Sequence, residues 1–251
     1  MDYGKNSKRG VKEEKERKGS ERVINILRFG NENSDIVLIQ LIDKREVSAP
    51  ERELYLIKEY TGRDLGMIAV SVDDWNKDLS PWSAPPIYGK EGFGSGADET
   101  LSWVLNNVIF KQDSEKNDIH RYILGGYSLA GLFALYSAHR TNVFEGIVAA
   151  SPSVWFPGFL EYAKENEIFA DYIYLSLGDK EERAKNKILA SVGNNIRELA
   201  AYYNTVTDVT LEWNEGNHFT EPDVRMAKGF AKLITDKSVP PCLNNIEVVS
   251  R

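Results

Sequence analysis

Short apolar runs that alternate with longer amphipathic segments are the feature that most restricts the fold of this 251-residue chain. Several runs are nearly continuous, as expected of strands buried on both faces of a sheet. We place strands at residues 22–29, 35–42, 67–72, 122–124, 144–151, 171–177 and 209–213. Helical spacing of apolar residues predicts helices at 51–60, 98–112, 130–139, 187–203 and 222–234. This alternation predicts an α/β fold with a mostly parallel, twisted sheet and helices on both faces.

The composition is that of one soluble globular domain. The hydrophobic fraction of 42% and the charged fraction of 27% are ordinary for such a domain, and the length suits a single α/β unit. We expect residues 22–251 to form it. Residues 1–21 combine mixed charge with few apolar side chains, so we expect a disordered or loosely packed leader there.

Charge and hydropathy exclude several classes of function. The net charge of −7 argues against a nucleic-acid partner. No apolar run reaches the roughly 18–20 residues of a membrane span, and no apolar segment follows the charged N-terminus as in a secretory signal. The single cysteine, Cys242, excludes an intrachain disulfide, and a cytoplasmic location is the expectation.

Residues 122–131, Tyr-Ile-Leu-Gly-Gly-Tyr-Ser-Leu-Ala-Gly, are typical of a strand, a tight turn and the start of a helix. This is the context of the nucleophile elbow, which makes Ser128 the candidate nucleophile. Small residues are needed two positions before and after the serine, and Gly126 and Ala130 occupy them. The usual motif is G-x-S-x-G, so Ala130 is a departure, with Gly131 one position later. The competing interpretation is a glycine-containing turn with an incidental serine.

A histidine and a group of acids follow the ends of two later predicted strands. A serine hydroxyl is a weak nucleophile and needs an adjacent base. His218 is the predicted base, because it follows the strand at 209–213 on a loop at the correct end of the sheet. His120 precedes the elbow strand, and His139 lies on the helix after it, well away from Ser128.

The acid that would orient His218 comes from the cluster after the strand at 171–177. Glu181 is favoured because it lies three residues past Gly178 and can curl back to His218. Asp179 and Glu182 remain alternatives. The chain order of serine, acid and histidine is that of α/β-hydrolases.

Backbone donors and aromatic residues complete the predicted site. The oxyanion donors are expected to be the N–H groups of Leu129, which follows the nucleophile, and Ile42, near the end of the second strand. The long segment 73–98 is expected to be an ordered loop that forms one wall of a pocket. Trp82 from this loop and Trp155, just past a strand end, are the candidate substrate-binding residues.

These motifs resemble the esterase D-like family of α/β-hydrolases over about residues 21–237. The resemblance rests on residues 126–131, 151–153, 175–182 and 216–219, and residues 78–85 are similar to a bacterial branch of the family. It implies an α/β-hydrolase fold without a large lid domain, and a triad of Ser128, His218 and an acid within 179–182. Members include S-formylglutathione hydrolases, feruloyl esterases, mycolyl transferases and esterases of catecholate siderophores. Many relatives place Asp-Gly after the second strand, where this chain has Gln40-Leu41.

The leading hypothesis is therefore a cytoplasmic serine carboxylesterase. It would cleave a small-molecule ester through an acyl-enzyme and would use no metal or cofactor. Two alternatives remain from the same residues: a catalytically silent α/β-hydrolase scaffold used for binding, and an acyltransferase that passes the acyl group to an alcohol.

Overall fold

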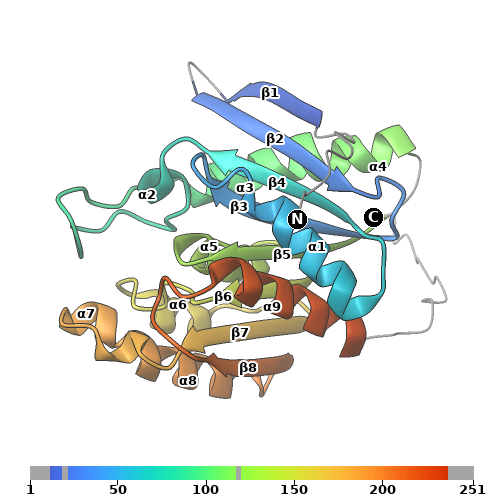
Figure 1. Cartoon of the computed structure of the whole chain (residues 1–251). Helices are drawn as coiled ribbons and strands as arrows, with labels where there is room; N and C mark the ends of the chain where they lie inside the picture. The colour runs from blue at the N-terminus through green and yellow to red at the C-terminus, as the bar shows by residue number, and fades with distance from the viewer. Residues whose placement is uncertain (1–11, 19–21, 117–119, 237–251) are drawn as a thin grey trace, which may run out of the picture.

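The strands assemble into a single sheet (Figure 1). The computed structural model describes residues 12–18, 22–116 and 120–236. Within these residues the strand order is β1-β2-β4-β3-β5-β6-β7-β8. Neighbouring strands from β4 across to β8 run parallel, whereas β2 is antiparallel to β1 and β4. The strands are β1 (Lys12–Lys18), β2 (Arg22–Gly30), β3 (Ile36–Asp43), β4 (Gly66–Val72), β5 (Arg121–Tyr127), β6 (Phe144–Ala150), β7 (Tyr172–Gly178) and β8 (Asp208–Asn214).

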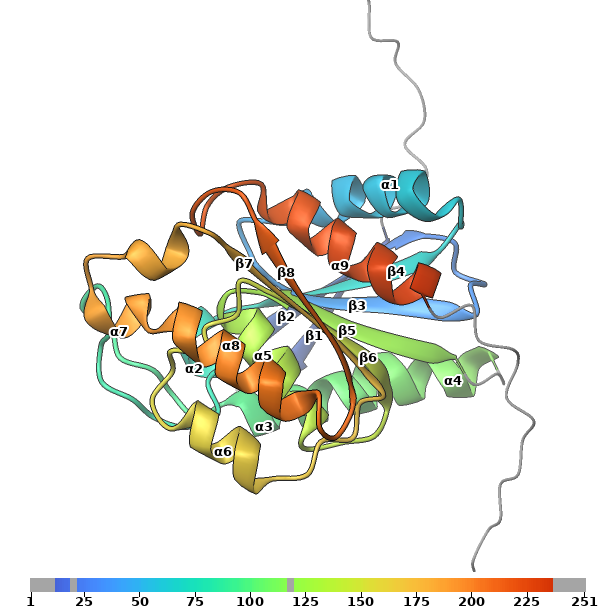
Figure 2. The same cartoon turned by 90° about the horizontal axis from the view of Figure 1, so that it is seen from below.

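Helices cover both faces of the sheet (Figure 2). The helices α1 (Ala49–Thr61) and α9 (Pro222–Asp236) lie side by side on one face, and α3 (Ala97–Val104), α5 (Leu129–Ala138) and α8 (Val192–Tyr203) lie on the other. The shorter elements are α2 (Trp75–Asp78), the π turn η1 (Leu105–Ile109), α4 (Phe110–Lys116), α6 (Phe159–Glu165), the 3-10 turn η2 (Glu181–Arg183) and α7 (Lys187–Ala190). The predicted α/β fold is confirmed, and the described residues include no separate lid domain.

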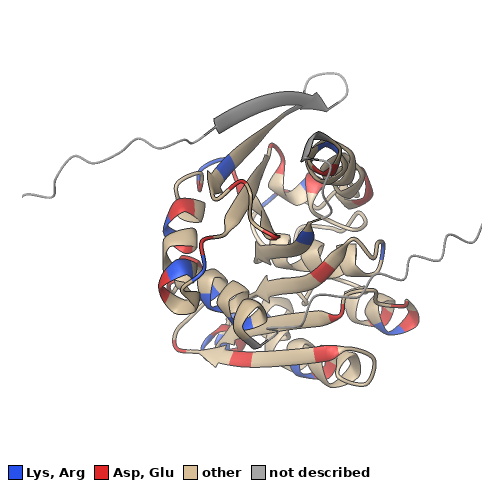
Figure 3. Ribbon diagram, turned by 90° about the vertical axis from the view of Figure 1, so that its right-hand side faces the viewer, with Lys and Arg blue, Asp and Glu red and all other residues tan. Residues whose placement is uncertain are grey.

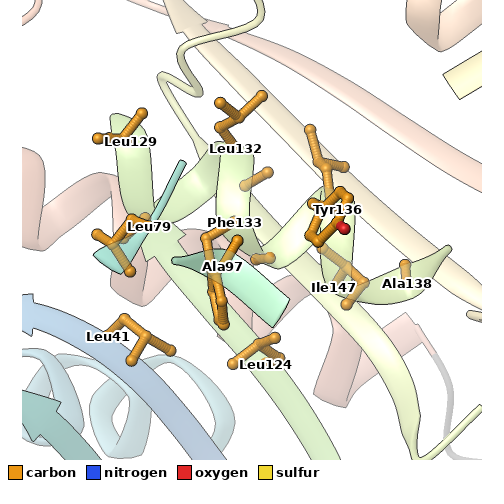
Figure 4. Close-up of a cluster of buried hydrophobic side chains, with 14 of the residues drawn as sticks. Leu41, Leu79, Ala97, Leu124, Leu129, Leu132, Phe133, Tyr136, Ala138 and Ile147 are labelled. Carbon is orange, nitrogen blue, oxygen red and sulfur yellow. The ribbon is translucent and has the colours of Figure 1, made fainter. Parts of the chain in front are cut away.

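Helix α5 is enclosed by the core (Figure 4). All ten of its residues are buried, whereas a surface helix buries only one stripe. Phe133 of α5 belongs to the same cluster as Leu41 of β3, Leu124 of β5 and Ile147 of β6. Because Ser128 directly precedes α5, the packing of this helix fixes where Ser128 lies relative to the sheet.

Charged residues lie mainly on the outer helices and loops, and the central strands carry few of them (Figure 3). The buried exceptions include Glu53, Glu181 and Arg225. No helix in the described part of the chain has the length and apolar character needed to cross a bilayer.

Strand β1 lies within the segment expected to be a leader. It pairs with β2 along its whole length, from Lys12 opposite Arg28 to Lys18 opposite Arg22. No strand is predicted there from the sequence, because every residue of β1 is charged and the segment has no apolar alternation. Residues 1–11 and 19–21 of the leader lie outside the described residues.

Two predicted helices differ in their details. The helix expected at 187–203 is divided into α7 and α8 at Ser191. The Ser191 hydroxyl donates to the Ile188 carbonyl at 2.7 Å, and such side-chain bonds compete with the helical backbone pattern. The helix expected at 98–112 extends from α3 through η1 into α4, with a π turn in the middle.

A buried carboxyl group lies between α1 and the sheet. Glu53 is 2% exposed, and the side-chain amide of Gln40 donates to its Oε1 at 3.3 Å. Burial raises the pKa of Glu53 to about 8, although the hydrogen bond from Gln40 acts to lower it. The second oxygens, Glu53 Oε2 and Gln40 Oε1, are buried and find no partner among the described residues. A protonated Glu53 carries an O–H donor, which suits the free amide oxygen of Gln40.

This carboxyl predicts a pH dependence of stability. Since the folded pKa lies above the unfolded value near 4.5, the stabilisation is full at low pH and is lost as pH rises through about 8. Replacing Glu53 with Gln removes this loss, so we expect the variant to exceed wild type by about 3–5 kcal/mol in free energy of unfolding at pH 9. Urea denaturation at pH 5, 7 and 9 measures the difference. The exposed Glu51→Gln serves as the control, and equal pH dependence of Glu53→Gln and wild type would contradict the assignment.

Candidate active site

The turn between β5 and α5 holds Ser128 in an uncommon conformation. Its φ of 59° and ψ of −120° are costly for a residue with a side chain, on the order of 1–3 kcal/mol. Hydrogen bonds on both sides hold this conformation: the Ser128 N–H donates to the Ala150 carbonyl at 3.1 Å, and the Ser153 N–H donates to the Ser128 carbonyl at 3.0 Å. The strained turn is therefore tied to β6 and to the loop that follows it.

Close backbone contact explains the small residues around the turn. A Cβ at Gly126 would lie 2.3 Å from the carbonyl carbon and oxygen of Ala130. A Cβ at Gly131 would lie 3.0 Å from the Gly126 carbonyl oxygen, which is tight but less severe. Glycine is thus required at 126, while the alanine at 130 is accommodated with no exposed surface.

The structure brings Ser128, His218 and Glu181 into one hydrogen-bonded line. Ser128 Oγ lies 3.0 Å from His218 Nε2, and His218 Nδ1 lies 2.7 Å from Glu181 Oε2. An ionised carboxylate only accepts hydrogen bonds, so Nδ1 carries the proton and donates to Glu181. This tautomer leaves Nε2 free to accept the proton of the Ser128 hydroxyl.

The other two acids of the cluster are engaged elsewhere. Asp179 Oδ1 accepts the N–H of Gly216 at 2.7 Å, within the loop that carries the histidine. Glu182 forms an ion pair with Arg197 at 2.8 Å on the surface. Of the three candidates, only Glu181 forms a side-chain hydrogen bond with His218 in the described part of the chain.

The remaining histidines have partners away from the elbow. His120 Nδ1 lies 3.2 Å from Asp113. His139 bonds through Nδ1 to the Glu167 carbonyl and through Nε2 to the Tyr203 hydroxyl, each at 2.8 Å. Burial lowers the pKa of His139, so it is held as a neutral packing residue.

The Glu181 carboxylate is buried but well supplied with donors. Its Oε1 accepts from the Ser151 hydroxyl at 2.7 Å, the Gly178 N–H at 2.8 Å and Arg225 Nη1 at 3.1 Å. Burial alone would raise the pKa of Glu181. The bond and charge of His218, with the bonds from Ser151 and Gly178, outweigh burial and hold this pKa below its usual value.

Arg225 joins the loops that carry the acid and the histidine. Its side chain is 2% exposed, and its Nη2 donates to the carbonyls of Glu215 at 3.1 Å and Asn217 at 3.0 Å. Its Nη1 also donates to the Tyr127 hydroxyl at 3.2 Å, and that hydroxyl donates to the His218 carbonyl at 2.7 Å. One guanidinium therefore links β5, the loop after β7 and the loop after β8.

No role was predicted from the sequence for Arg225, Ser151 or Tyr127. Ser151 and Tyr127 lie in or beside the motifs that carry the family resemblance, and that was their only signal. Arg225 lies in the first turn of a predicted helix, and nothing in that local pattern distinguishes it from a solvent-exposed arginine.

A cavity of about 580 Å³ opens beside Ser128 and His218. Trp155, one of the two predicted aromatic residues, lines it and is 9% exposed. Tyr88 brings the loop between β4 and α3 to the same wall, and its ring meets that of Trp155 edge to face at 5.9 Å. The expected contribution of this long loop to a pocket wall is thus visible at Tyr88.

Trp82, the other predicted aromatic residue, is not among the residues that line this cavity. Its indole N–H donates to the Pro157 carbonyl at 2.8 Å, and its ring packs against Phe156 and Tyr162. These contacts anchor the long loop to the segment before α6.

The predicted oxyanion donors lie on either side of the elbow. Leu129 is the first residue of α5, where N–H groups have no partner inside the helix. Ile42 lies in β3 one residue beyond Leu41, the last β3 residue that pairs with β5, opposite Gly126. The pairing of β3 with β5 therefore ends beside the turn, one residue before the buried Ile42. The described residues contain no cluster of three or more His, Cys, Asp or Glu side chains suited to hold a metal ion.

Comparisons with known proteins identify the fold. No protein-family model matches the chain, and no curated protein matches it either. The siderophore hydrolase EstB from Aspergillus nidulans is 18% identical, with a TM-score of 0.74 over 96% of this chain and 100% of that one. An IroE-like serine hydrolase from Shewanella oneidensis is 12% identical, with a TM-score of 0.74 over 91% and 82%.

A third solved structure extends the comparison. The enterochelin esterase from Shigella flexneri is 15% identical, with a TM-score of 0.64 over 90% of this chain and 58% of that one. At these identities the likeness establishes the fold alone. The chain has the α/β-hydrolase fold.

Proposed function

We propose that this α/β-hydrolase-fold chain is a serine carboxylesterase that cleaves a small-molecule ester through an acyl-enzyme on Ser128. The observation that carries the proposal is the hydrogen-bonded line from Ser128 through His218 to Glu181, with distances of 3.0 Å and 2.7 Å, at the wall of a 580 Å³ cavity. The names of the similar structures, a siderophore hydrolase and an enterochelin esterase among them, also favour ester chemistry.

In the first step Ser128 Oγ attacks the carbonyl carbon of the ester as its proton passes to His218 Nε2. Glu181 stabilises the imidazolium that forms and keeps the ring in the productive tautomer. Because hydrogen bonds hold the pKa of Glu181 below its usual value, the carboxylate is ionised throughout the neutral range.

The negative oxygen of the tetrahedral intermediate would be held by the N–H groups of Leu129 and Ile42. Leu129 begins α5, so the positive end of the helix dipole favours the same charge. Collapse of the intermediate expels the alcohol, which takes the proton from His218. Water then attacks the acyl-enzyme with His218 as base, and the carboxylic acid leaves Ser128 free.

Arg225 acts in this proposal as a positioning residue. It is buried behind Glu181 and contacts neither Ser128 nor the cavity. Its bonds to the carbonyls of Glu215 and Asn217 set the path of the loop that carries His218. Its charge also offsets part of the negative charge that Glu181 presents to the imidazole.

A silent binding scaffold is the competing hypothesis. Binding alone does not need a serine hydroxyl within hydrogen-bonding reach of an imidazole, whereas ester hydrolysis does. The 3.0 Å contact between Ser128 and His218 therefore favours the esterase. Membership of the esterase D-like family and its bacterial branch, and a cytoplasmic location, stay predictions from the sequence.

Turnover of p-nitrophenyl butyrate tests the proposed function. Ser128→Ala should lower kcat by about 10³-fold or more, since the nucleophile is removed. Glu181→Gln should lower it by about 10²-fold or more, because an amide cannot stabilise the imidazolium. Glu182→Gln is the matched control and should resemble wild type, because the Glu182 carboxylate neighbours Glu181 in sequence but pairs with Arg197. Wild-type turnover by Ser128→Ala, or equal losses in the two glutamate variants, would contradict the assignment.

The pH profile of kcat/KM tests the role of Arg225. In Arg225→Met the cation paired with Glu181 is lost, so the carboxylate presents more of its negative charge to the imidazolium that forms during the reaction. We expect the acidic limb to move upward by about half a pH unit or more. Arg225→Lys keeps the charge but loses the forked bonds, so its limb should stay near that of wild type while kcat falls. Circular dichroism verifies folding, and an unmoved limb in folded Arg225→Met would show that Arg225 serves stability alone.

A further inference from the structure

Two cations stand at the cavity beside the proposed catalytic residues. Lys180 and Arg183 both line the cavity, and both are exposed to solvent. Lys180 directly precedes the 3-10 turn η2 and Arg183 is its last residue, and the Arg183 N–H donates to the Lys180 carbonyl at 3.1 Å. A bond between residues three apart places the two residues on the same side of the turn, and both side chains line the one cavity.

Neither cation has an ion-pair partner of its own within the described part of the protein; the charge of Arg183 acts on the Glu182 carboxylate from beyond ion-pair distance, and that carboxylate is paired with Arg197. No side-chain hydrogen bond or ion pair joins Lys180 or Arg183 to another described residue, whereas other cations of the same region, such as Arg197, are paired. The nearby acids are already engaged: Asp179 with a backbone N–H, Glu181 with the catalytic histidine, and Glu182 with Arg197. Two cations at one cavity, neither in an ion pair of its own, favour binding of an anion there.

Apart from these two cations, the proposed catalytic residues, Ser151 and Asn217, the residues that line the cavity are apolar or aromatic. Leu189 and Val192 line it, together with the rings of Tyr88, Trp155 and Phe219. Phe219 follows the catalytic histidine directly, and its side chain is 86% exposed, which is unusual for a large apolar residue. Such walls suit the apolar body of a ligand, and the cations suit a charged group at its end.

We propose that Lys180 and Arg183 form a subsite for an anionic group, so that the preferred ester has an apolar body and carries a carboxylate some carbons from the scissile bond. This proposal rests on the esterase activity proposed above. The chain as a whole has a net charge of −7, which repels anions at long range, so local cations are needed to admit such a substrate.

Matched substrates test the subsite. One pair carries the charge on the acyl side: p-nitrophenyl hydrogen adipate is compared with its neutral methyl ester. The other pair carries it on the alcohol side: 4-carboxyphenyl butyrate is compared with the neutral 4-methoxycarbonylphenyl butyrate. The ratio of kcat/KM for anionic over neutral substrate should fall by about fivefold or more in the double variant Lys180→Gln/Arg183→Gln on at least one side. The side that responds identifies which part of the ester carries the charge. The ratio should also fall in wild type at high salt.

The double variant Lys185→Gln/Lys187→Gln is the matched control. It removes two exposed positive charges from the same stretch of chain, outside the cavity lining, and its ratio should equal that of wild type. Equal ratios in wild type and Lys180→Gln/Arg183→Gln on both sides, or an equal fall in the control, would overturn the subsite while leaving the esterase intact.

Equilibrium binding makes the test independent of turnover. Two unreactive amides replace the esters: N-(4-carboxyphenyl)butyramide carries the charge on the alcohol side, and adipic acid monobutylamide carries it on the acyl side. Each amide is titrated calorimetrically into wild type and both double variants. At least one should bind Lys180→Gln/Arg183→Gln about fivefold or more weakly than wild type. If Lys180→Gln/Arg183→Gln bound both amides as tightly as wild type does, the subsite would be overturned whether or not the protein hydrolyses esters. If this variant bound an amide more weakly but wild type hydrolysed no ester, the subsite would stand and the esterase proposal alone would be contradicted.

Discussion

The strained backbone of Ser128 is the constraint on which the rest of the site depends. A serine at φ 59° is held only because its N–H and carbonyl are bonded to the β6 end and to the loop beyond it, while Gly126 allows the helix to start directly against the strand. The helix that follows is buried on all sides, so the turn cannot relax without opening the core. The position of one hydroxyl is thereby set by the packing of the whole sheet.

A buried network of charged groups fixes the position of the His218 imidazole. Glu181 and Arg225 are both nearly inaccessible, and burial of an ion is tolerated only when its bonding capacity is filled. Every side-chain hydrogen bond that Arg225 makes to the described residues goes to a group from another loop or strand. These groups are the Glu181 carboxylate, the Ser151 and Tyr127 hydroxyls and two carbonyls before His218. The ion pair therefore orients the histidine loop as well as the acid, which couples the site's geometry to its electrostatics.

Local patterns explain what could be predicted from the sequence. Apolar runs marked the strands from β2 to β8, and the glycine-flanked serine marked the turn, because both signals lie within a few residues. The edge strand β1 was not predicted, because its residues are all charged. The break between α7 and α8 was not predicted either, because it depends on one side-chain hydrogen bond of Ser191. The anchoring of Trp82 at Pro157 and the contacts of Arg225 join residues from 8 to 98 positions apart, and no local pattern encodes such pairings.

The central claim is that Ser128 is activated as a nucleophile by His218. Mass spectrometry of peptides after treatment with a fluorophosphonate tests it most directly, because this reagent phosphonylates serines that have an adjacent base. We expect a single adduct on the peptide that contains Ser128, and none on that peptide in a folded His218→Asn variant. An adduct on another residue, or equal labelling of Ser128 without His218, would contradict it.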